Sequence, residues 1–139
     1  MADTELALLI DRLLRRIHTS LQTNSAAFDS ENVGPAGGLI LLTLSEMGAP
    51  ELNELTRRFA RDKSQMTRVV RMLEAKGLVD RSPSKRDSRA SVIRLTKKGE
   101  TVVSALETAL TSAIGEILSP LSDDETQILK DLMRRAVDQ

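Results

Sequence analysis

The apolar positions of this 139-residue chain follow helical spacing over most of its length and strand-like spacing in one short region. Residues 3–26 carry Leu and Ile three or four positions apart, the period of a helix with one apolar face. Comparable stripes follow at 35–47, 50–59, 63–76, 97–118 and from 123 onward. Two short segments, 78–82 and 91–95, include the β-branched pair Val92 and Ile93, which favours strands. The pattern predicts a mainly α chain with one small β-hairpin.

The stripe at 63–76 has its own start and stop signals. Asp62 stands where an N-cap belongs, and Gln65 three residues later completes a capping box with Asp in the Ser/Thr role. Gly77 is placed to end the helix. Together with the short helix expected at 50–59, this makes a helix-turn-helix, and the hairpin that follows makes it a winged helix.

Other caps and breaks delimit the remaining helices. Pro35 suits the first position of a helix after the turn at Gly34. Thr96 is placed to cap the helix that follows the hairpin, and Ser122 with Glu125 forms a capping box for the last one.

The helix at 63–76 has an outward face that is defined by its buried one. Met66, Val69, Val70 and Leu73 lie at i, i+3, i+4 and i+7 and form the expected core stripe. The residues projecting away from it are Ser64, Gln65, Thr67, Arg68 and Arg71. These residue types hydrogen-bond base edges or phosphates, and an α-helix fits the major groove of DNA. An ordinary charged surface helix has a similar pattern, so this helix alone does not decide the function.

Charge is distributed unevenly although the net charge is zero. Residues 57–99 hold 14 basic and four acidic side chains, a net charge of +10, and the rest of the chain carries −10. A basic block of this kind favours a polyanionic partner, because each neutralised phosphate releases condensed counterions. A solvated charged face is the plainer interpretation, and the concentration of charge argues against it.

The hairpin tip adds a second basic element. Lys85, Arg86 and Arg89 surround a single acid, Asp87, in the stretch "RSPSKRDSRASVIRL" of residues 81–95. Such a tip can reach a DNA backbone or a narrow minor groove, whose negative potential attracts arginine. Asp87 either pairs with the guanidinium of Arg89 or is simply a turn residue, and the spacing fits both.

Composition narrows the classes of function. The chain has no cysteine and one histidine, His18, so we expect no disulfide, no metal site and no cofactor. No nucleophile, base or phosphate-loop arrangement suggests an enzyme. The acidic start and the short apolar runs predict neither a signal peptide nor a membrane span, hence a cytoplasmic protein.

The segment "DKSQMTRVVRMLEAKGLVDRSPSKRDSRASVIRLTKKGE", residues 62–100, resembles the winged helix of the MarR (multiple antibiotic resistance regulator) family of bacterial transcription factors. The resemblance is specific in "KGLVDR", "RDSR" and "LTKKG", and outside this segment it is one of layout. It implies a homodimer with dimerisation helices at 1–30 and 101–139 and a DNA-binding lobe at 31–100. Such regulators read a pseudo-palindromic site in double-stranded DNA, commonly repress neighbouring genes, and often release DNA on binding a small aromatic or phenolic effector.

Residue by residue, the resemblance places Ser64, Gln65, Thr67, Arg68 and Arg71 on the recognition helix, and Asp87 and Arg89 on the acid-x-Arg motif of the wing. It favours the pairing in which Asp87 steadies Arg89.

His18 either lines an effector cavity or faces solvent. The apolar stripes of the terminal helices either join two copies or pack within one chain. An alternative function is protein assembly through the winged helix, against which the outward face argues because it lacks aromatic anchors.

Overall fold

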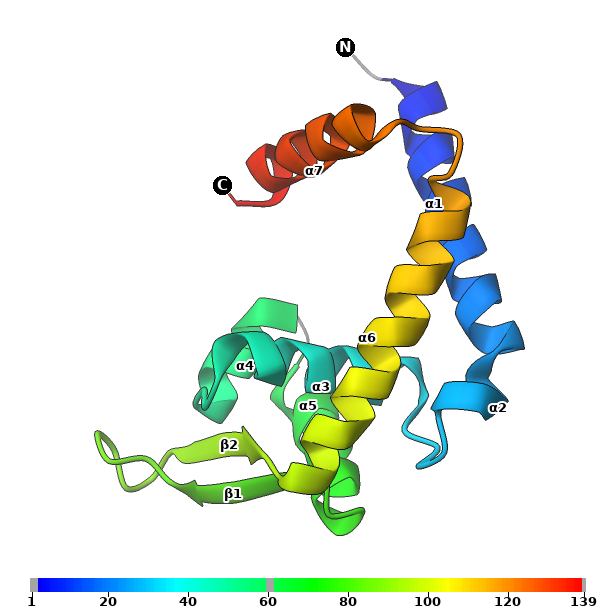
Figure 1. Ribbon diagram of the computed structural model, residues 1–139. Helices are drawn as coiled ribbons and strands as arrows, with labels where there is room; N and C mark the ends of the chain where they lie inside the picture. The colour runs from blue at the N-terminus through cyan, green and yellow to red at the C-terminus, as the bar shows by residue number, and fades with distance from the viewer. Residues whose placement is uncertain (1–2, 60–61, 139) are drawn as a thin grey trace. The chain divides into compact units, whose positions relative to one another are not determined.

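The computed structural model describes residues 3–59 and 62–138 and is mainly helical (Figure 1). Its elements, in chain order, are α1 (Thr4–Thr23), α2 (Ser25–Phe28), α3 (Gly34–Met47), α4 (Leu52–Phe59), α5 (Lys63–Ala75), β1 (Val79–Pro83), β2 (Ser91–Leu95), α6 (Lys97–Ile117) and α7 (Asp123–Val137). The two strands pair antiparallel in one hairpin. The predicted fold class, mainly α with a small β-hairpin, is therefore confirmed.

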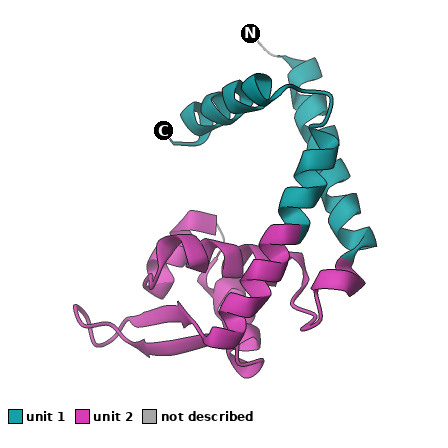
Figure 2. Ribbon diagram, in the orientation of Figure 1, with its two compact units in different colours: residues 1–24, 109–139 teal, residues 25–108 magenta. Residues whose placement is uncertain are grey.

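The chain divides into two compact units (Figure 2). Unit 1 comprises residues 1–24 and 109–139, and unit 2 comprises residues 25–108. Unit 2 therefore contains α2 to α5, the hairpin and the first part of α6, whereas α1, the end of α6 and α7 belong to unit 1.

The core of unit 2 is aliphatic, as the composition predicted. Its fully buried side chains are Ile40, Leu41, Leu44, Leu55, Met66, Val70, Leu73, Leu78, Val79 and Ile93. These come from α3, α4, α5, both strands and Leu78 just before β1, so the helix-turn-helix and the hairpin share one core. Phe28 and Phe59 pack against it while partly buried. Removal of aliphatic surface from water is the main driving force for folding, so packing against this core stabilises the position of α5.

The hairpin has an additional neighbour that the sequence did not predict. The strand register pairs Val79 with Leu95 and Pro83 with Ser91. Before α4, Glu51 forms an isolated antiparallel bridge with Val92, and the Ile93 N–H donates to the Pro50 carbonyl at 2.9 Å. The segment leading into α4 thus covers the free edge of β2.

Unit 1 is built from amphipathic helices with well-formed starts. The Asp3 carboxylate accepts from the Leu6 N–H at 2.9 Å, and the predicted capping box of Ser122 and Glu125 is present. Within their described residues, α1 and α7 bury no side chain. Their large apolar side chains, about half exposed, include Leu6, Leu9, Ile10, Leu14, Ile128, Leu132 and Met133. In a single chain, the two predicted stripes therefore face solvent.

The first helix ends earlier than predicted. The spacing predicted a helix to about residue 26, but α1 ends at Thr23 and the four-residue α2 follows. Asn24 closes α1 because both its backbone N–H and its amide group donate to the Ser20 carbonyl. Asp29 then accepts from the N–H groups of Val33 and Gly34 at 2.9 and 3.1 Å, which organises the entry to α3.

Candidate nucleic-acid interface

Helix α5 presents the outward face that its spacing predicted. Asp62 caps its first turn, accepting from the Gln65 N–H at 2.8 Å, and Gly77 follows it with a positive φ of 74°. Met66, Val70 and Leu73 are fully buried, and Val69 is partly buried against the same core. On the opposite side, Ser64, Gln65, Arg68 and Arg71 are exposed and Thr67 is half-buried. The buried stripe therefore orients a row of hydrogen-bond donors toward solvent.

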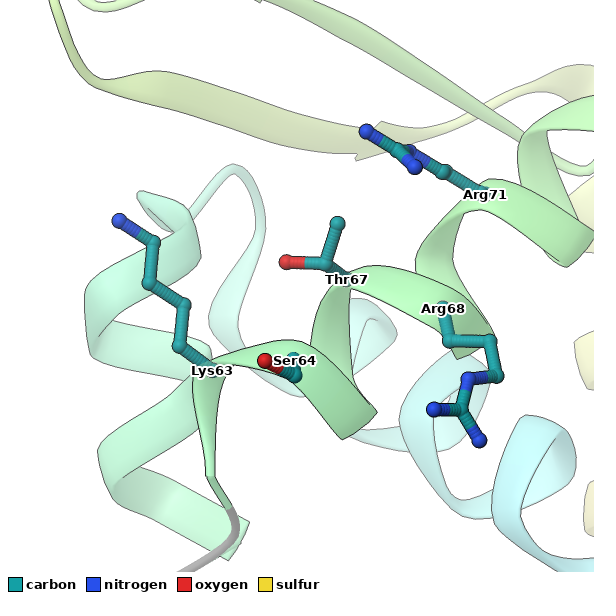
Figure 3. A pocket seen from close by; sticks show the side chains of 5 residues that line it. All are labelled: Lys63, Ser64, Thr67, Arg68 and Arg71. Carbon is teal, nitrogen blue, oxygen red and sulfur yellow. The ribbon is translucent and has the colours of Figure 1, made fainter.

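A surface depression of about 460 Å³ lies along this face (Figure 3). Its lining residues are Lys63, Ser64, Thr67, Arg68 and Arg71. Lys63, Thr67 and Arg71 extend to one side of α5 and Arg68 turns to the other. Lys63 was not among the predicted site residues, although its exposed position at the helix start was a signal for it. The depression holds three cationic side chains at its wall, which suits an anionic group.

The hairpin loop, residues 84–90, is closed by its own backbone. The Ser84 N–H donates to the Ala90 carbonyl at 2.9 Å, and the Ala90 N–H donates to the Asp87 carbonyl at 3.0 Å. Lys85, Arg86 and Arg89 are exposed, as predicted. Within residues 3–59 and 62–138, neither Lys85 nor Arg89 forms an ion pair. Two cations of the tip are therefore unneutralised.

The side-chain pair expected between Asp87 and Arg89 is not formed. The Asp87 carboxylate instead accepts from the backbone N–H of Arg89 at 3.0 Å. This is an Asx-type turn, in which a short carboxylate satisfies an N–H two residues later in place of a guanidinium. Asp87 therefore shapes the loop through the backbone, and the guanidinium of Arg89 is left unpaired in the described part of the chain.

Arg86 differs from the other cations of the tip. Its Nη2 atom lies 3.8 Å from Glu54 Oε1 and 3.9 Å from Glu51 Oε1. Beside it, the Ser84 hydroxyl donates to the same Glu51 oxygen at 2.6 Å. Sequence analysis missed Ser84, Glu51 and Glu54, because 33 residues separate Ser84 from Glu51 and no local pattern connects them.

Several basic side chains of the 57–99 stretch are engaged inside unit 2. Lys76 Nζ donates to the Glu31 carbonyl at 2.7 Å, and Lys98 Nζ donates to the Lys76 carbonyl at 2.9 Å. Arg58 pairs with Glu46 at 2.8 Å, and Arg81 Nε lies 3.9 Å from Glu74 Oε1. The charge available to a polyanion is therefore smaller than the count of +10, and α5 and the hairpin tip supply part of it.

His18, which was predicted either to line an effector cavity or to face solvent, belongs to unit 1. The imidazole is exposed on α1. A depression of about 530 Å³ in this unit is lined by Arg15, Arg16, Thr19, Ser20, Glu116 and Ile117, and His18 is not part of its wall. Among the described residues, no group of three or more His, Asp or Glu side chains is placed to hold a metal ion. No helix in the same ranges has the length and apolar character needed to cross a membrane.

The arrangement of α3, α4, α5 and the hairpin coincides with a known sequence family. A family model described as the MarR family matches residues 36–91, from α3 to the first residue of β2. The chain is therefore similar to the MarR family over residues 36–91. The match contains the residues predicted for the recognition helix and the hairpin tip, and it joins this chain to winged-helix transcriptional regulators.

Individual relatives extend the likeness beyond that segment. The chain is 29% identical over 104 residues to "Uncharacterized HTH-type transcriptional regulator YxaD" of Bacillus subtilis (strain 168), covering 75% of this chain and 73% of the relative. It is 30% identical over 105 residues to "Exopolysaccharide II synthesis transcriptional activator ExpG" of Rhizobium meliloti (strain 1021), which matches 76% of this chain and only 54% of ExpG. The chain thus spans about half the length of ExpG.

A solved structure is similar over nearly the whole chain. The PcaV transcriptional regulator from Streptomyces coelicolor, in complex with its natural ligand, is 28% identical with a TM-score of 0.71. The match covers 99% of this chain and 98% of PcaV. The MarR fold therefore extends through α1, α6 and α7 as well as the winged helix.

Proposed function

We propose that this chain is a MarR family member that regulates transcription by binding a specific site in double-stranded DNA, with α5 in the major groove and the hairpin loop in the adjacent minor groove. The observation that carries the proposal is the outward face of α5. Ser64, Gln65, Thr67, Arg68 and Arg71 stand opposite the buried stripe, and Lys63 extends the row. Arginine, glutamine and hydroxyl groups are the side chains that read base edges in the major groove.

The wing supplies the second contact in this proposal. Lys85 and Arg89 are exposed and form no ion pair within the described residues, so no internal partner has to be displaced. Arginine is attracted to the minor groove because the groove focuses negative potential. The turn made by Asp87 fixes the backbone at Arg89, which lowers the entropy lost when the arginine inserts.

A homodimer joined through unit 1 completes the proposal. The exposed apolar stripes of α1 and α7, including Leu9, Leu14, Ile128 and Leu132, are what a second copy would cover. Unit 1 holds nine acidic and six basic side chains, a net charge of −3, so DNA attracts the basic stretch at 57–99 and not the dimer region. Two copies would read a pseudo-palindromic site, one half-site each.

The dimer has a direct test in a matched pair of substitutions on α7. Ile128 is 58% exposed on the apolar stripe, and Lys130 lies about 200° away around the helix, on the polar face. Ile128→Glu is expected to yield monomers in light scattering after size exclusion, and Lys130→Glu to stay dimeric. A wild-type protein that is monomeric at micromolar concentration contradicts the dimer.

Repression of neighbouring genes in the cytoplasm, relieved by a small aromatic or phenolic molecule, is the regulatory form of this proposal. PcaV, at 28% identity, has a structure with its natural ligand, which supports a search for an effector here. Thermal melting of the protein against a panel of phenolic and benzoic acids tests it. An effector must raise the melting temperature and also lower retention of DNA. A compound that raises only the melting temperature is not an effector.

The DNA-binding proposal is tested by selection of duplexes from a random library at near-physiological salt, where non-specific binding is weak. The expected result is one enriched motif with two-fold symmetry and half-site centres about one helical turn apart. The alternative function, protein assembly through the winged helix, predicts no enrichment together with a stable complex with an acidic protein. Absence of any enriched motif would contradict the DNA-binding role.

A further inference from the structure

A polar cluster fastens the hairpin loop to the start of α4, and the proposed DNA contacts leave it unexplained. We call it the wing anchor, and its members are Glu51, Glu54, Ser84 and Arg86. The Ser84 hydroxyl donates to Glu51 Oε1 at 2.6 Å. Arg86 Nη2 lies 3.9 Å from that oxygen and 3.8 Å from Glu54 Oε1. Two acids thus meet the hairpin loop, next to the exposed cations Lys85 and Arg89.

Ser84 is the central residue of this cluster. Among residues 3–59 and 62–138, it is the one polar side chain that is buried, with 8% of its surface exposed. Its hydroxyl donates to Glu51 and accepts from the Arg86 N–H at 3.2 Å, while its backbone N–H donates to the Ala90 carbonyl. A buried hydroxyl requires hydrogen-bond partners, so loss of the Glu51 carboxylate would leave this residue unsatisfied.

The Glu51 carboxylate is itself held in place. The residue forms the bridge to Val92 beside β2, and its N–H lies 3.4 Å from Glu54 Oε1. Its side chain is only 20% exposed, whereas that of Arg86 is 82% exposed. An ion pair between Glu51 and so exposed a guanidinium contributes little to the stability of the loop, because water screens the two charges. The charge-assisted bond from Ser84 to Glu51 is therefore the main side-chain link between the hairpin loop and the start of α4.

Electrostatics alone makes the opposite prediction about these acids. A carboxylate close to a phosphate-binding surface repels DNA, so its removal should strengthen binding. If the Glu51 carboxylate also holds the hairpin loop in place, its removal lets the loop move. DNA binding then has to order the loop, and the entropy lost in doing so weakens the affinity. The two effects on DNA affinity have opposite signs, so a substitution at Glu51 distinguishes between them.

We infer that Glu51 and Ser84 are positioning residues that hold the hairpin loop where Lys85 and Arg89 meet DNA. The inference rests on the proposed DNA-binding function. It assigns a role to two residues outside the recognition helix and the wing motif.

The test compares substitutions at one position with the selected duplex as the probe. Glu51→Ala removes the acceptor of the Ser84 bond and is expected to weaken DNA binding about tenfold, although it also removes a negative charge. Glu51→Gln keeps an amide oxygen for Ser84 and is expected to bind as tightly as the wild type or more tightly. Glu107→Ala, on the exposed side of α6 in unit 2, controls for loss of one acid and is expected to leave affinity unchanged. Affinity in Glu51→Ala equal to or above that of the wild type overturns the inference.

Backbone amide hydrogen exchange gives a readout that does not depend on DNA. The N–H groups of Arg86 and Ala90 are expected to exchange faster in Glu51→Ala and in Ser84→Ala, and at the wild-type rate in Glu51→Gln. If Glu51→Ala does not fold, Ser84→Ala takes its place, with the same expected loss of affinity. If the wild type retains no DNA, the proposed function fails, and the anchor is still tested. Unchanged exchange in the folded alanine variants overturns it.

Discussion

Replacement of Gly99 by alanine tests whether the hairpin is locked to α6 by a contact that only glycine permits. Gly99 lies in the first turn of α6, where its N–H donates to the Thr96 hydroxyl at 3.0 Å. A Cβ atom added there would lie 2.1 Å from the carbonyl oxygen of Leu78 and 3.1 Å from its carbonyl carbon. That oxygen also accepts from the Thr96 N–H at 3.1 Å, and the Leu78 side chain is fully buried.

The geometry gives the size of the effect. Backbone atoms have to separate by about 1 Å, and overpacking of this kind costs about 3 kcal/mol at the upper end of its usual range. A weakened bond from Thr96 to Leu78 adds about 1 kcal/mol. Alanine is the better helix former by about 1 kcal/mol, which offsets part of this cost. The expected net destabilisation for Gly99→Ala is about 3 kcal/mol, or a melting temperature lower by about 10 °C.

A second glycine of α6 provides the matched control. A Cβ atom at Gly115 meets no atom within 4 Å in the described structure, so Gly115→Ala gains helix propensity without a clash. It is expected to stabilise the chain by about 0.5–1 kcal/mol. Urea unfolding followed by far-UV circular dichroism, at equal protomer concentration, measures both variants. A Gly99→Ala protein as stable as the wild type would refute the packing argument.

Three further predictions concern the DNA contacts and the last helix. Arg89→Ala should weaken binding across all sequences and reduce the salt slope by about 1, and an unchanged slope at several salt concentrations would remove Arg89 from the interface. Arg71→Ala should relax specificity at one base pair by about 1–3 kcal/mol in competition binding, whereas a uniform loss would make Arg71 a phosphate contact. The pKa of Glu125 is lowered from its ordinary value of 4.5 by the hydrogen bonds from the Ser122 backbone and hydroxyl. The ionised carboxylate therefore stabilises α7 at any pH above 4.5, and this contribution is lost as the pH falls through the lower pKa of the folded state. Glu125→Gln should therefore show a smaller decrease of melting temperature on acidification than the wild type, and an equal decrease would argue against the capping contribution.

Local signals in the sequence were sufficient to predict where several of the helices begin and end. The cap at Asp62, the stop at Gly77 and the capping box at Ser122 each depend on residues within four positions, and each is present in the structure. The Thr96 hydroxyl caps α6 as predicted, accepting from the Gly99 N–H. The helical spacing of the apolar residues and the capping residues together therefore predicted which side of α5 faces solvent.

Contacts between distant segments were not predictable in the same way. No spacing rule links Glu51 with Ser84, so the wing anchor and the bridge of Glu51 to Val92 became visible only in three dimensions. The spacing left two partners open for Asp87, because a carboxylate in a turn can satisfy either a guanidinium or a nearby N–H. The family resemblance favoured the guanidinium of Arg89, and the structure shows the turn. The nearer group, the backbone N–H of Arg89, is already positioned by the turn and costs no side-chain entropy.

Hydroxyl-radical footprinting of the selected duplex tests the central claim most directly, because it locates α5 and the wing on the two grooves at once. The account predicts two protected segments related by two-fold symmetry, with centres about one helical turn apart, and flanking minor-groove protection that disappears in Arg89→Ala. Footprints without symmetry, or flanking protection that persists unchanged in Arg89→Ala, would contradict it.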